Sequence, residues 1–297
     1  MGTPKAIILS GYGLNCEEET ALAFKLAGGI AYIVHINDLI DSPKKLSSYQ
    51  ILAIPGGFSY GDDLGSGKAY ANKLRNHLQK HLQDFTSKDK LVIGICNGFQ
   101  ILTNLGLLPG VLTFNDNNRY TDRWVDVKIT PSQPSPSRGG RLHSGSLKKQ
   151  SVQIPLLSKE GLELALDWFR GEVSPWLHGI TSLSLPIAHG EGKFVASNDV
   201  LKSIKKQGQI GGVYYKGTIS DYQNLKSNPN GSTLDIAMLT SENGKILGTM
   251  PHPERGIFFT QTPHWPLEKE KLIREGRPLP KYTNALKIFK NAINYFT

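Results

Sequence analysis

Leu91–Leu102, with the sequence LVIGICNGFQIL, decides the fold of this chain. Its first half is an unbroken apolar run of strand length, and Phe99–Leu105 has the apolar spacing of a helix. Gly94 and Gly98 lie two places either side of Cys96, so the backbone can turn sharply at the cysteine. The pattern predicts a buried strand that leads directly into a helix, with Cys96 at the turn.

Short apolar runs and amphipathic stretches alternate from the N-terminus up to this segment. The expected strands are Lys5–Ser10, Ala31–Ile36 and Ile51–Ile54, and the expected helices are Glu17–Ala27 and Leu64–Phe85. Strands of this length separated by helices pair in parallel. We therefore expect an α/β fold of the flavodoxin-like kind, with a doubly wound, mostly parallel sheet and helices on both faces.

The second half of the chain has a less regular pattern. Residues 131–151 are rich in Ser, Pro, Gly and basic residues, and 156–169 has helical spacing, so about 131–180 is interpreted as a loop and helix insertion. Strand-like runs then return, and a closing helix is expected over Tyr282–Phe296. These runs are Leu183–Ile187, Gly212–Tyr215, Leu234–Leu239 and Ile246–Met250. We expect a single domain over residues 1–297.

Composition excludes several classes of protein. The 297 residues are 39% hydrophobic and 20% charged, which is enough apolar material for a substantial core. No long apolar run is present, so we expect neither a signal peptide nor a membrane span, and a cytoplasmic location. The net charge of +9 is not gathered into a dense basic block, so we expect no nucleic-acid partner. Two cysteines without a CxxC pair predict no metal site and no disulfide framework.

The turn at Cys96 suits a nucleophile. The N-terminal end of the helix that follows favours a thiolate, and the backbone N–H of Asn97 is placed to meet a developing oxyanion. A buried core cysteine between loop glycines has the same local sequence, so this motif alone leaves both interpretations open.

A thiol nucleophile needs a base, and His252 stands late in the chain between Pro251 and Pro253. The two prolines favour a stiff, extended segment just after a predicted strand. Residues two apart in an extended segment face the same side, which would let Glu254 orient the imidazole. A solvated loop histidine is the alternative for this motif in isolation.

The third segment is Pro55-Gly56-Gly57, after the strand at Ile51–Ile54. Adjacent glycines let the backbone approach a ligand, so the N–H of Gly57 is the second candidate oxyanion donor, although Pro-Gly-Gly also forms ordinary turns. All three segments follow predicted strands, and open α/β sheets place their sites at that edge. Together they are more specific than any one of them.

The combination resembles the class I, or triad, glutamine amidotransferases, and in particular the glutaminase subunits of phosphoribosylformylglycinamidine synthase. The segments that carry this resemblance are PGGFSYGDD (55–63), GICNGFQIL (94–102), PIAHGEGKF (186–194), NPNGS (228–232), MPHPER (250–255) and GLNCE (13–17). The resemblance implies that Cys96 is the nucleophile, His252 the general base and acid, and Glu254 the orienting residue.

The resemblance also implies the ligands and partners. L-glutamine is the expected ammonia donor, and a separate synthetase subunit, with a small third subunit, is the expected partner. No cofactor is expected in this chain, while ATP and Mg²⁺ are expected on the synthetase.

Three further residues are candidates for a lesser role. Gln100 and His189 are possible residues of the substrate pocket, with packing as the alternative for Gln100 and a second base as the alternative for His189. Cys16 is expected to be structural.

Two other functions remain to be distinguished: another α/β thiol hydrolase, such as a γ-glutamyl hydrolase or amidase, and a catalytically silent binding module. The segments GGFSYGD and HGEG argue against the first, and the intact Cys, His and Glu argue against the second.

Overall fold

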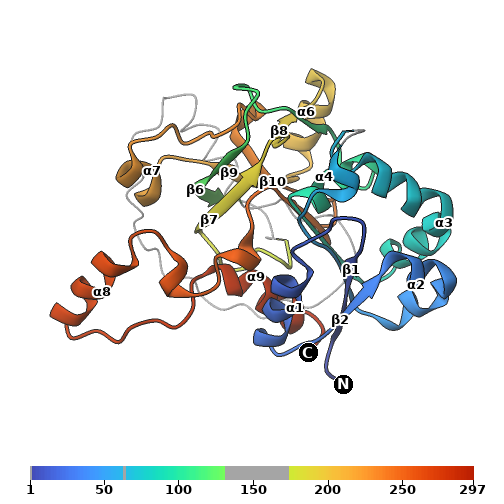
Figure 1. The fold of residues 1–297 in the computed structure, drawn as a ribbon, viewed down its shortest axis with the longest axis horizontal. Coiled ribbons are helices and arrows are strands. Elements are labelled where there is room, and N and C mark those ends of the chain that lie inside the picture. The colour runs from blue at the N-terminus through green and yellow to red at the C-terminus, as the bar shows by residue number, and fades with distance from the viewer. Residues whose placement is uncertain (1, 63–64, 131–173) are drawn as a thin grey trace.

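The computed structural model describes residues 2–62, 65–130 and 174–297 (Figure 1). Within them the chain forms one nine-stranded sheet with the order β2-β1-β3-β4-β11-β10-β9-β6-β7. In that order the strands are Ile30–His35, Lys5–Ser10, Ile51–Ile54, Leu91–Ile95, Ile246–Thr249, Ile236–Thr240, Ile210–Tyr214, Thr121–Ile129 and Ser182–His189. A second, two-stranded sheet pairs β5 (Val111–Thr113) with β8 (Lys193–Val195).

One half of the large sheet is parallel. Strands β2, β1, β3, β4 and β11 pair in parallel with their neighbours. The predicted strands of the first hundred residues match β1 to β4 within about one residue at each end, and the α/β fold class is confirmed. Because Ile54 pairs with Gly94, and Thr249 with Ile95, the carboxyl ends of β3, β4 and β11 meet at one edge of the sheet.

The other half of the sheet is antiparallel, so the sheet as a whole is mixed. Strands β10, β9, β6 and β7 follow β11 with antiparallel pairing throughout. Strand β6 is absent from the sequence-based expectation, because its sequence TDRWVDVKI alternates polar and apolar residues and contains no long apolar run. A half-exposed antiparallel strand gives that weaker signal.

Helices cover the parallel half on both faces. The described α-helices are α1 (Glu17–Leu26), α2 (Ile36–Asp41), α3 (Lys68–Thr86), α4 (Asn97–Asn104), α6 (Asn198–Lys206), α7 (Thr218–Gln223), α8 (Trp265–Arg274) and α9 (Ala285–Asn294). Helix α1 packs against α9, where the rings of Phe24 and Phe289 meet edge to face at 5.1 Å. Helix α4 packs on β3, β4 and β11 beside α3. Right-handed crossovers in opposite directions from β1 and from β3 place α1 and α3 on opposite faces.

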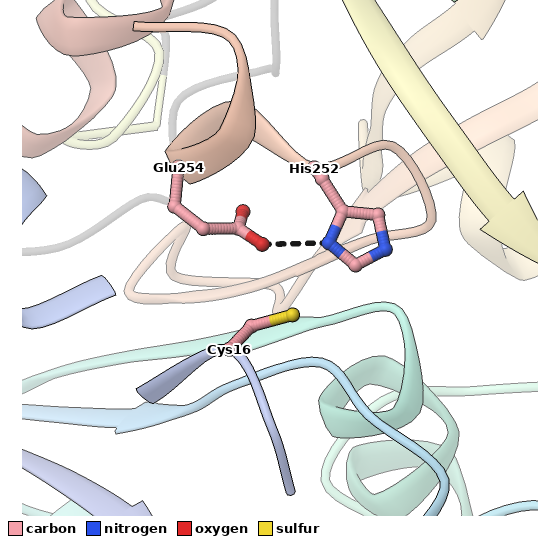
Figure 2. A group of neighbouring side chains, drawn as sticks. All are labelled: Cys16, His252 and Glu254. Carbon is pink, nitrogen blue, oxygen red and sulfur yellow. Dashed lines mark hydrogen bonds and ion pairs between the residues drawn. The ribbon is translucent and has the colours of Figure 1, made fainter. Parts of the chain in front are cut away.

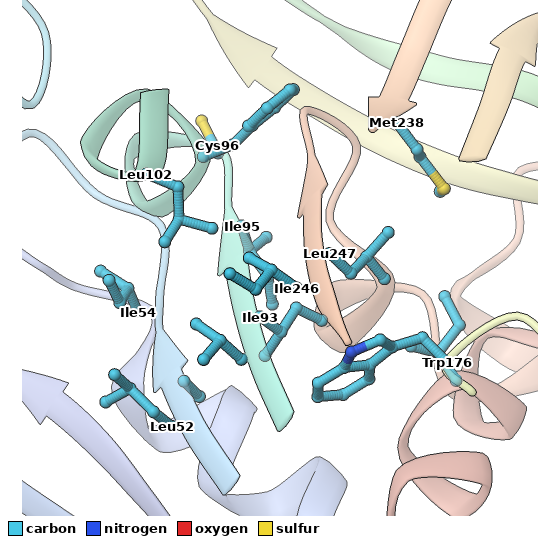
Figure 3. Close-up of a cluster of buried hydrophobic side chains, with 14 of the residues drawn as sticks. Leu52, Ile54, Ile93, Ile95, Cys96, Leu102, Trp176, Met238, Ile246 and Leu247 are labelled. Carbon is cyan, nitrogen blue, oxygen red and sulfur yellow. The ribbon is translucent and has the colours of Figure 1, made fainter. Parts of the chain in front are cut away.

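The core that fixes the site lies around β3, β4 and β11 (Figure 3). Leu52, Ile93 and Leu247 project from these strands and are fully buried. Trp176 closes the cluster from the segment before β7, and its indole N–H donates to the backbone oxygen of Lys245 at 2.9 Å. Such a close-packed centre gives the strand ends little freedom to move.

Some predicted boundaries differ from the structure. Helix α3 begins at Lys68, because Gly67 takes a left-handed conformation with φ of 74° immediately before it. Helix α9 begins at Ala285 instead of Tyr282, since the N–H of Thr283 donates to the oxygen of Ile257 at 2.7 Å. The predicted helix over 156–169 and most of the predicted insertion lie outside the described residues. The single domain over residues 1–297 stays a prediction. No helix in the described ranges has the length and apolar character to cross a membrane.

Candidate active site

The backbone at Cys96 forms the sharp turn that the sequence predicts. Cys96 joins β4 to α4 with φ of 50° and ψ of −106°, a conformation that residues with side chains rarely adopt. A Cβ atom on Gly98 would overlap the backbone oxygen of Ile54, and one on Gly94 would lie 2.5 Å from the oxygen of Gly98. The two glycines therefore let α4 begin directly against β3. The N–H of Cys96 donates to the oxygen of Thr249 at 2.7 Å, which ties the turn to β11.

His252 and Glu254 form a buried hydrogen-bonded pair (Figure 2). The Nδ1 atom of His252 lies 2.6 Å from Oε1 of Glu254, and both side chains are almost fully buried. His252 has an extended backbone, and its N–H donates to the oxygen of Pro186 at 2.8 Å. However, the expected extended segment ends there, because Pro253–Arg255 forms a 3₁₀ turn. The expected route by which Glu254 approaches the ring is thus wrong, since the turn and not an extended strand brings the carboxylate to it.

The surroundings of His252 favour its charged form. Burial by itself lowers the pKa of the imidazole, but the Glu254 carboxylate, the Cys96 sulfur and the Cys16 thiol together raise the pKa well above its ordinary value. Glu254 occupies Nδ1, while Nε2 is buried and makes no hydrogen bond to any described residue. The free nitrogen is therefore the one available for proton exchange with a nucleophile or substrate.

The Cys96 thiol lies at the same edge of the sheet. Its Sγ atom is 3.7 Å from the backbone oxygen of Ala188 in β7, a weak hydrogen bond that the thiol donates. Cys96 influences the pKa of His252, so the two groups lie within electrostatic range of each other. The structure thus brings together a thiol, an imidazole and a carboxylate from β4 and from the segment after β11.

Both candidate oxyanion donors have backbone N–H groups without a partner among the described residues. Gly57 forms an antiparallel bridge with Leu14 in which the neighbours Phe58 and Asn15 make the hydrogen bonds. In such a pair the N–H of Gly57 points away from Leu14. Gly57 has φ of 152°, and a Cβ atom there would lie 2.7 Å from the Cα of Leu14. Asn97 is the first residue of α4, where an N–H has no partner within the helix.

Gln100 has both ends of its amide engaged by the protein. Its Nε2 donates to the backbone oxygen of Glu191 at 2.6 Å, and its Oε1 accepts from Nδ2 of Asn97 at 2.8 Å. The side chain is buried and connects α4 to the loop after β7. In this arrangement Gln100 supports the site from within the protein, and the predicted contact with substrate remains a prediction.

His189 is buried at the end of β7. Its Nδ1 lies 3.1 Å from Oδ1 of Asn115, and that oxygen also accepts the N–H of Gly192 at 3.0 Å. Since Oδ1 is the acceptor, Nδ1 of His189 carries the proton. Burial, with a smaller contribution from His252, lowers the pKa of His189 to about 3. A neutral imidazole of that pKa is too weak a base to replace His252 at neutral pH.

Cys16 lies beside the His252–Glu254 pair, although its motif suggests a merely structural residue. Ligand atoms of Cys16, His252 and Glu254 all lie within 4.8 Å of one another, and the described residues contain no other such group of three metal-ligating side chains. Two ligands of a tetrahedral zinc ion stand about 3.3 Å apart. The 2.6 Å between Nδ1 and Oε1 is instead the length of a hydrogen bond, so the group as it stands is not a preformed metal site. The position of Cys16 after β1, at the same edge of the sheet, was the signal in the sequence that could have revealed this contact.

Comparisons with known proteins identify the family of this chain. The family model described as "CobB/CobQ-like glutamine amidotransferase domain" matches residues 3–144 and 170–296. A protein of Methanococcus maripaludis strain C5 named "Phosphoribosylformylglycinamidine synthase subunit PurQ" is 40% identical over 305 residues, which cover 99% of this chain and 98% of that protein. A protein of the same name from Dehalococcoides mccartyi is 36% identical and covers 97% of this chain and 98% of its own length.

A solved structure also has the same fold. The "Structure of PurLQS from Thermotoga maritima" matches with a TM-score of 0.63 and 24% identity, and the match covers 100% of both chains. The family, the mixed α/β sheet and the thiol–imidazole–carboxylate group all lead to one assignment. The chain belongs to the CobB/CobQ-like glutamine amidotransferases, within the family of PurQ subunits of phosphoribosylformylglycinamidine synthase.

Proposed function

We propose that this glutamine amidotransferase hydrolyses L-glutamine with Cys96, His252 and Glu254, and that it passes the ammonia to a synthetase subunit. The observation that carries the proposal is the buried 2.6 Å bond between His252 and Glu254. It leaves Nε2 of His252 free at the edge of the sheet where β4 ends in Cys96. Cys96, His252 and Glu254 are thus arranged as the nucleophile, the base and the orienting group of acyl transfer.

The first half of the reaction forms a thioester. The Cys96 thiolate attacks the side-chain amide carbon of glutamine, and the carbonyl π electrons move to oxygen. The N–H groups of Gly57 and Asn97 hold that oxyanion. When the intermediate collapses, the carbon–nitrogen bond breaks and His252 gives its Nε2 proton to the departing ammonia.

The second half releases glutamate. His252, now neutral, accepts a proton from water as the water attacks the thioester carbon. The carbon–sulfur bond then breaks, and Cys96 leaves as the thiolate beside a recharged imidazolium. Glu254 keeps Nδ1 protonated through both halves, so the imidazole always presents Nε2 to the reacting atoms.

The ammonia released from glutamine is consumed by a different subunit, the synthetase. The solved Thermotoga maritima structure is of an assembly, PurLQS. By analogy, we propose that this chain assembles with a synthetase subunit and a small third subunit. The synthetase converts formylglycinamide ribotide to formylglycinamidine ribotide, and it holds the ATP and Mg²⁺. We propose no cofactor for this chain.

The Cys96→Ala variant tests the proposal in the assembled synthase. Glutamine-dependent synthesis and ammonia release from glutamine should both disappear, because the acyl group has no acceptor. Synthesis from added ammonium salt should continue, since the synthetase is untouched. If the variant still releases ammonia from glutamine, the assignment of the nucleophile is wrong.

A further inference from the structure

We propose that Cys16 is a positioning residue of the glutaminase centre, and that its thiol holds the His252 imidazole in place against Glu254. The inference rests on the function proposed above for His252. It concerns a thiol that takes no part in the mechanism described so far.

The backbone of Cys16 is held at two points. Its N–H donates to the oxygen of Gly56 at 3.1 Å, in the loop after β3. Its own oxygen accepts from the hydroxyl of Thr20 at 2.6 Å and from the N–H of Thr20 at 3.1 Å, in the first turn of α1. The Cys16 side chain therefore projects from a fixed point between two elements.

The thiol faces the edge of the ring that binds Glu254. A Cβ atom built on Gly56 would lie 2.6 Å from Cε1 and 3.3 Å from Nδ1 of His252, and 3.4 Å from Sγ of Cys16. Gly56, the thiol and the Nδ1–Cε1 edge of the imidazole thus meet at one place. Figure 2 shows the sulfur of Cys16 pointing toward the gap between the carboxylate and the ring. Nε2, on the far edge of the ring, remains free for chemistry.

The Cys16 thiol is suited to support rather than reaction. The side chain is 7% exposed, and burial raises the pKa of its thiol, while the nearby imidazole opposes that rise. A neutral thiol fills the space as a small apolar group, yet its S–H remains a weak donor. One oxygen of Glu254, Oε2, is buried and has no hydrogen bond to a described residue. The Cys16 sulfur is therefore suited to exclude water from the His252–Glu254 pair without competing strongly with the imidazole for the Glu254 carboxylate.

Several titratable groups surround His252 and must be considered together. They are Glu254 on its own turn, Cys96 at the end of β4, Cys16 before α1, His189 at the end of β7 and Tyr120 before β6. Glu254, Cys96 and Cys16 favour the charged imidazole. Of these three, Cys16 is the one that can be changed without removing the nucleophile or the orienting group.

The test measures how fast iodoacetamide alkylates Cys96 as a function of pH, in wild-type protein and in Cys16→Ala. The tryptic peptide that contains Cys96 reports the reaction separately from Cys16, and the chain has no other cysteine. Loss of the support destabilises the imidazolium that favours the Cys96 thiolate. Alkylation of Cys96 at pH 6 should therefore fall about tenfold relative to wild type, whereas at pH 9 it should stay within about twofold.

Two further variants separate positioning from folding. Phe24→Leu weakens α1 at its contact with Phe289 but leaves the Cys16 thiol in place, and should lower stability without moving the pH profile. Cys16→Ser restores a small side chain with a donor and should return the profile toward that of wild type. In the assembled synthase, Cys16→Ala should lower kcat for glutamine more than it changes KM.

The outcomes that test Cys16 as a positioning residue are distinct from those that test Cys96 as the nucleophile. A Cys16→Ala profile that coincides with wild type, with only reduced stability as in Phe24→Leu, overturns the positioning role. Complete loss of glutaminase activity with normal alkylation of Cys96 also overturns it, because Cys16 would then react itself. Failure of the proposed function would instead appear as glutamine hydrolysis that survives Cys96→Ala.

Discussion

Replacement of Glu254 by Gln removes the charge beside His252 and keeps the shape of the side chain. The wild-type bond is 2.6 Å long and buried on both sides. In Glu254→Gln the amide N–H₂ can donate to Nδ1, which would move the imidazole proton to Nε2. The neutral ring then has no lone pair at Nε2, which the second half of the reaction needs in order to accept a proton from water. Burial, no longer opposed by the carboxylate, also lowers the pKa of the imidazole.

The size of the expected loss of activity in Glu254→Gln follows from the charge and the burial of the His252–Glu254 pair. A hydrogen bond to a charged group contributes about 1.5–3 kcal/mol, and breaking a buried charge pair costs about 3–5 kcal/mol. At about 1.4 kcal/mol for each factor of ten, a loss of about 3–4 kcal/mol lowers kcat for glutamine by roughly 10²–10³. KM should change little, since Glu254 contacts the base and not the substrate.

The pH dependence has a definite sign. In wild-type protein the pKa of His252 lies above its ordinary value, so the imidazolium persists to a higher pH than in a free histidine and is lost as the pH rises through that pKa. In Glu254→Gln the loss should occur at a lower pH. The assay is glutaminase turnover by the assembled synthase between pH 6 and pH 9, with ammonium-dependent synthesis as the control. Turnover within about threefold of wild type, with an unmoved alkaline limb, would falsify the orienting role of Glu254.

Two other variants test the elbow and the second histidine. Gly98→Ala places a Cβ atom against the backbone oxygen of Ile54, where neither group can move freely, so we expect a loss of about 1–3 kcal/mol in unfolding free energy and little glutaminase activity. Urea unfolding and turnover measure the two effects, and a fully stable, active variant would contradict the close approach. His189, with a pKa of about 3 when folded and about 6.5 when unfolded, takes up a proton mainly in the unfolded state as the pH falls below 6.5. Between pH 7 and pH 5 the wild type should therefore lose about 2 kcal/mol more stability than His189→Gln, and equal losses would contradict a buried, neutral imidazole.

The sequence predicted the strands of the parallel half because each of them is strongly patterned, whereas the short helix α2 was not predicted. Fully buried strands such as Ile51–Ile54 and Leu91–Ile95 are continuous apolar runs, and glycines mark the turns that follow them. Strand β6 and the exposed helix α8 were missed for the opposite reason. Their residues contact solvent, or are only partly covered, so their patterns resemble those of loops.

Site residues were predictable where local geometry restricts the choice of residue, and not where a contact arises only in three dimensions. Gly94 and Gly98 are required by the backbone at Cys96, so the motif itself contains the information. Cys16 has no such local constraint. Its position against His252 depends on the hydrogen bond between its N–H and the oxygen of Gly56, two segments about forty residues apart in the sequence.

The antiparallel half of the sheet contributes to the site as much as the doubly wound half does. Strand β7 supplies the oxygen of Pro186, which holds the N–H of His252, and the oxygen of Ala188, which lies next to the Cys96 thiol. Edge strands normally leave such oxygens to solvent. Here they face the segment after β11 and the elbow after β4, so β7 sets the distance between base and nucleophile from outside the parallel core. A fold that stopped at β11 would present Cys96 at the sheet edge but would leave His252 without its backbone anchor.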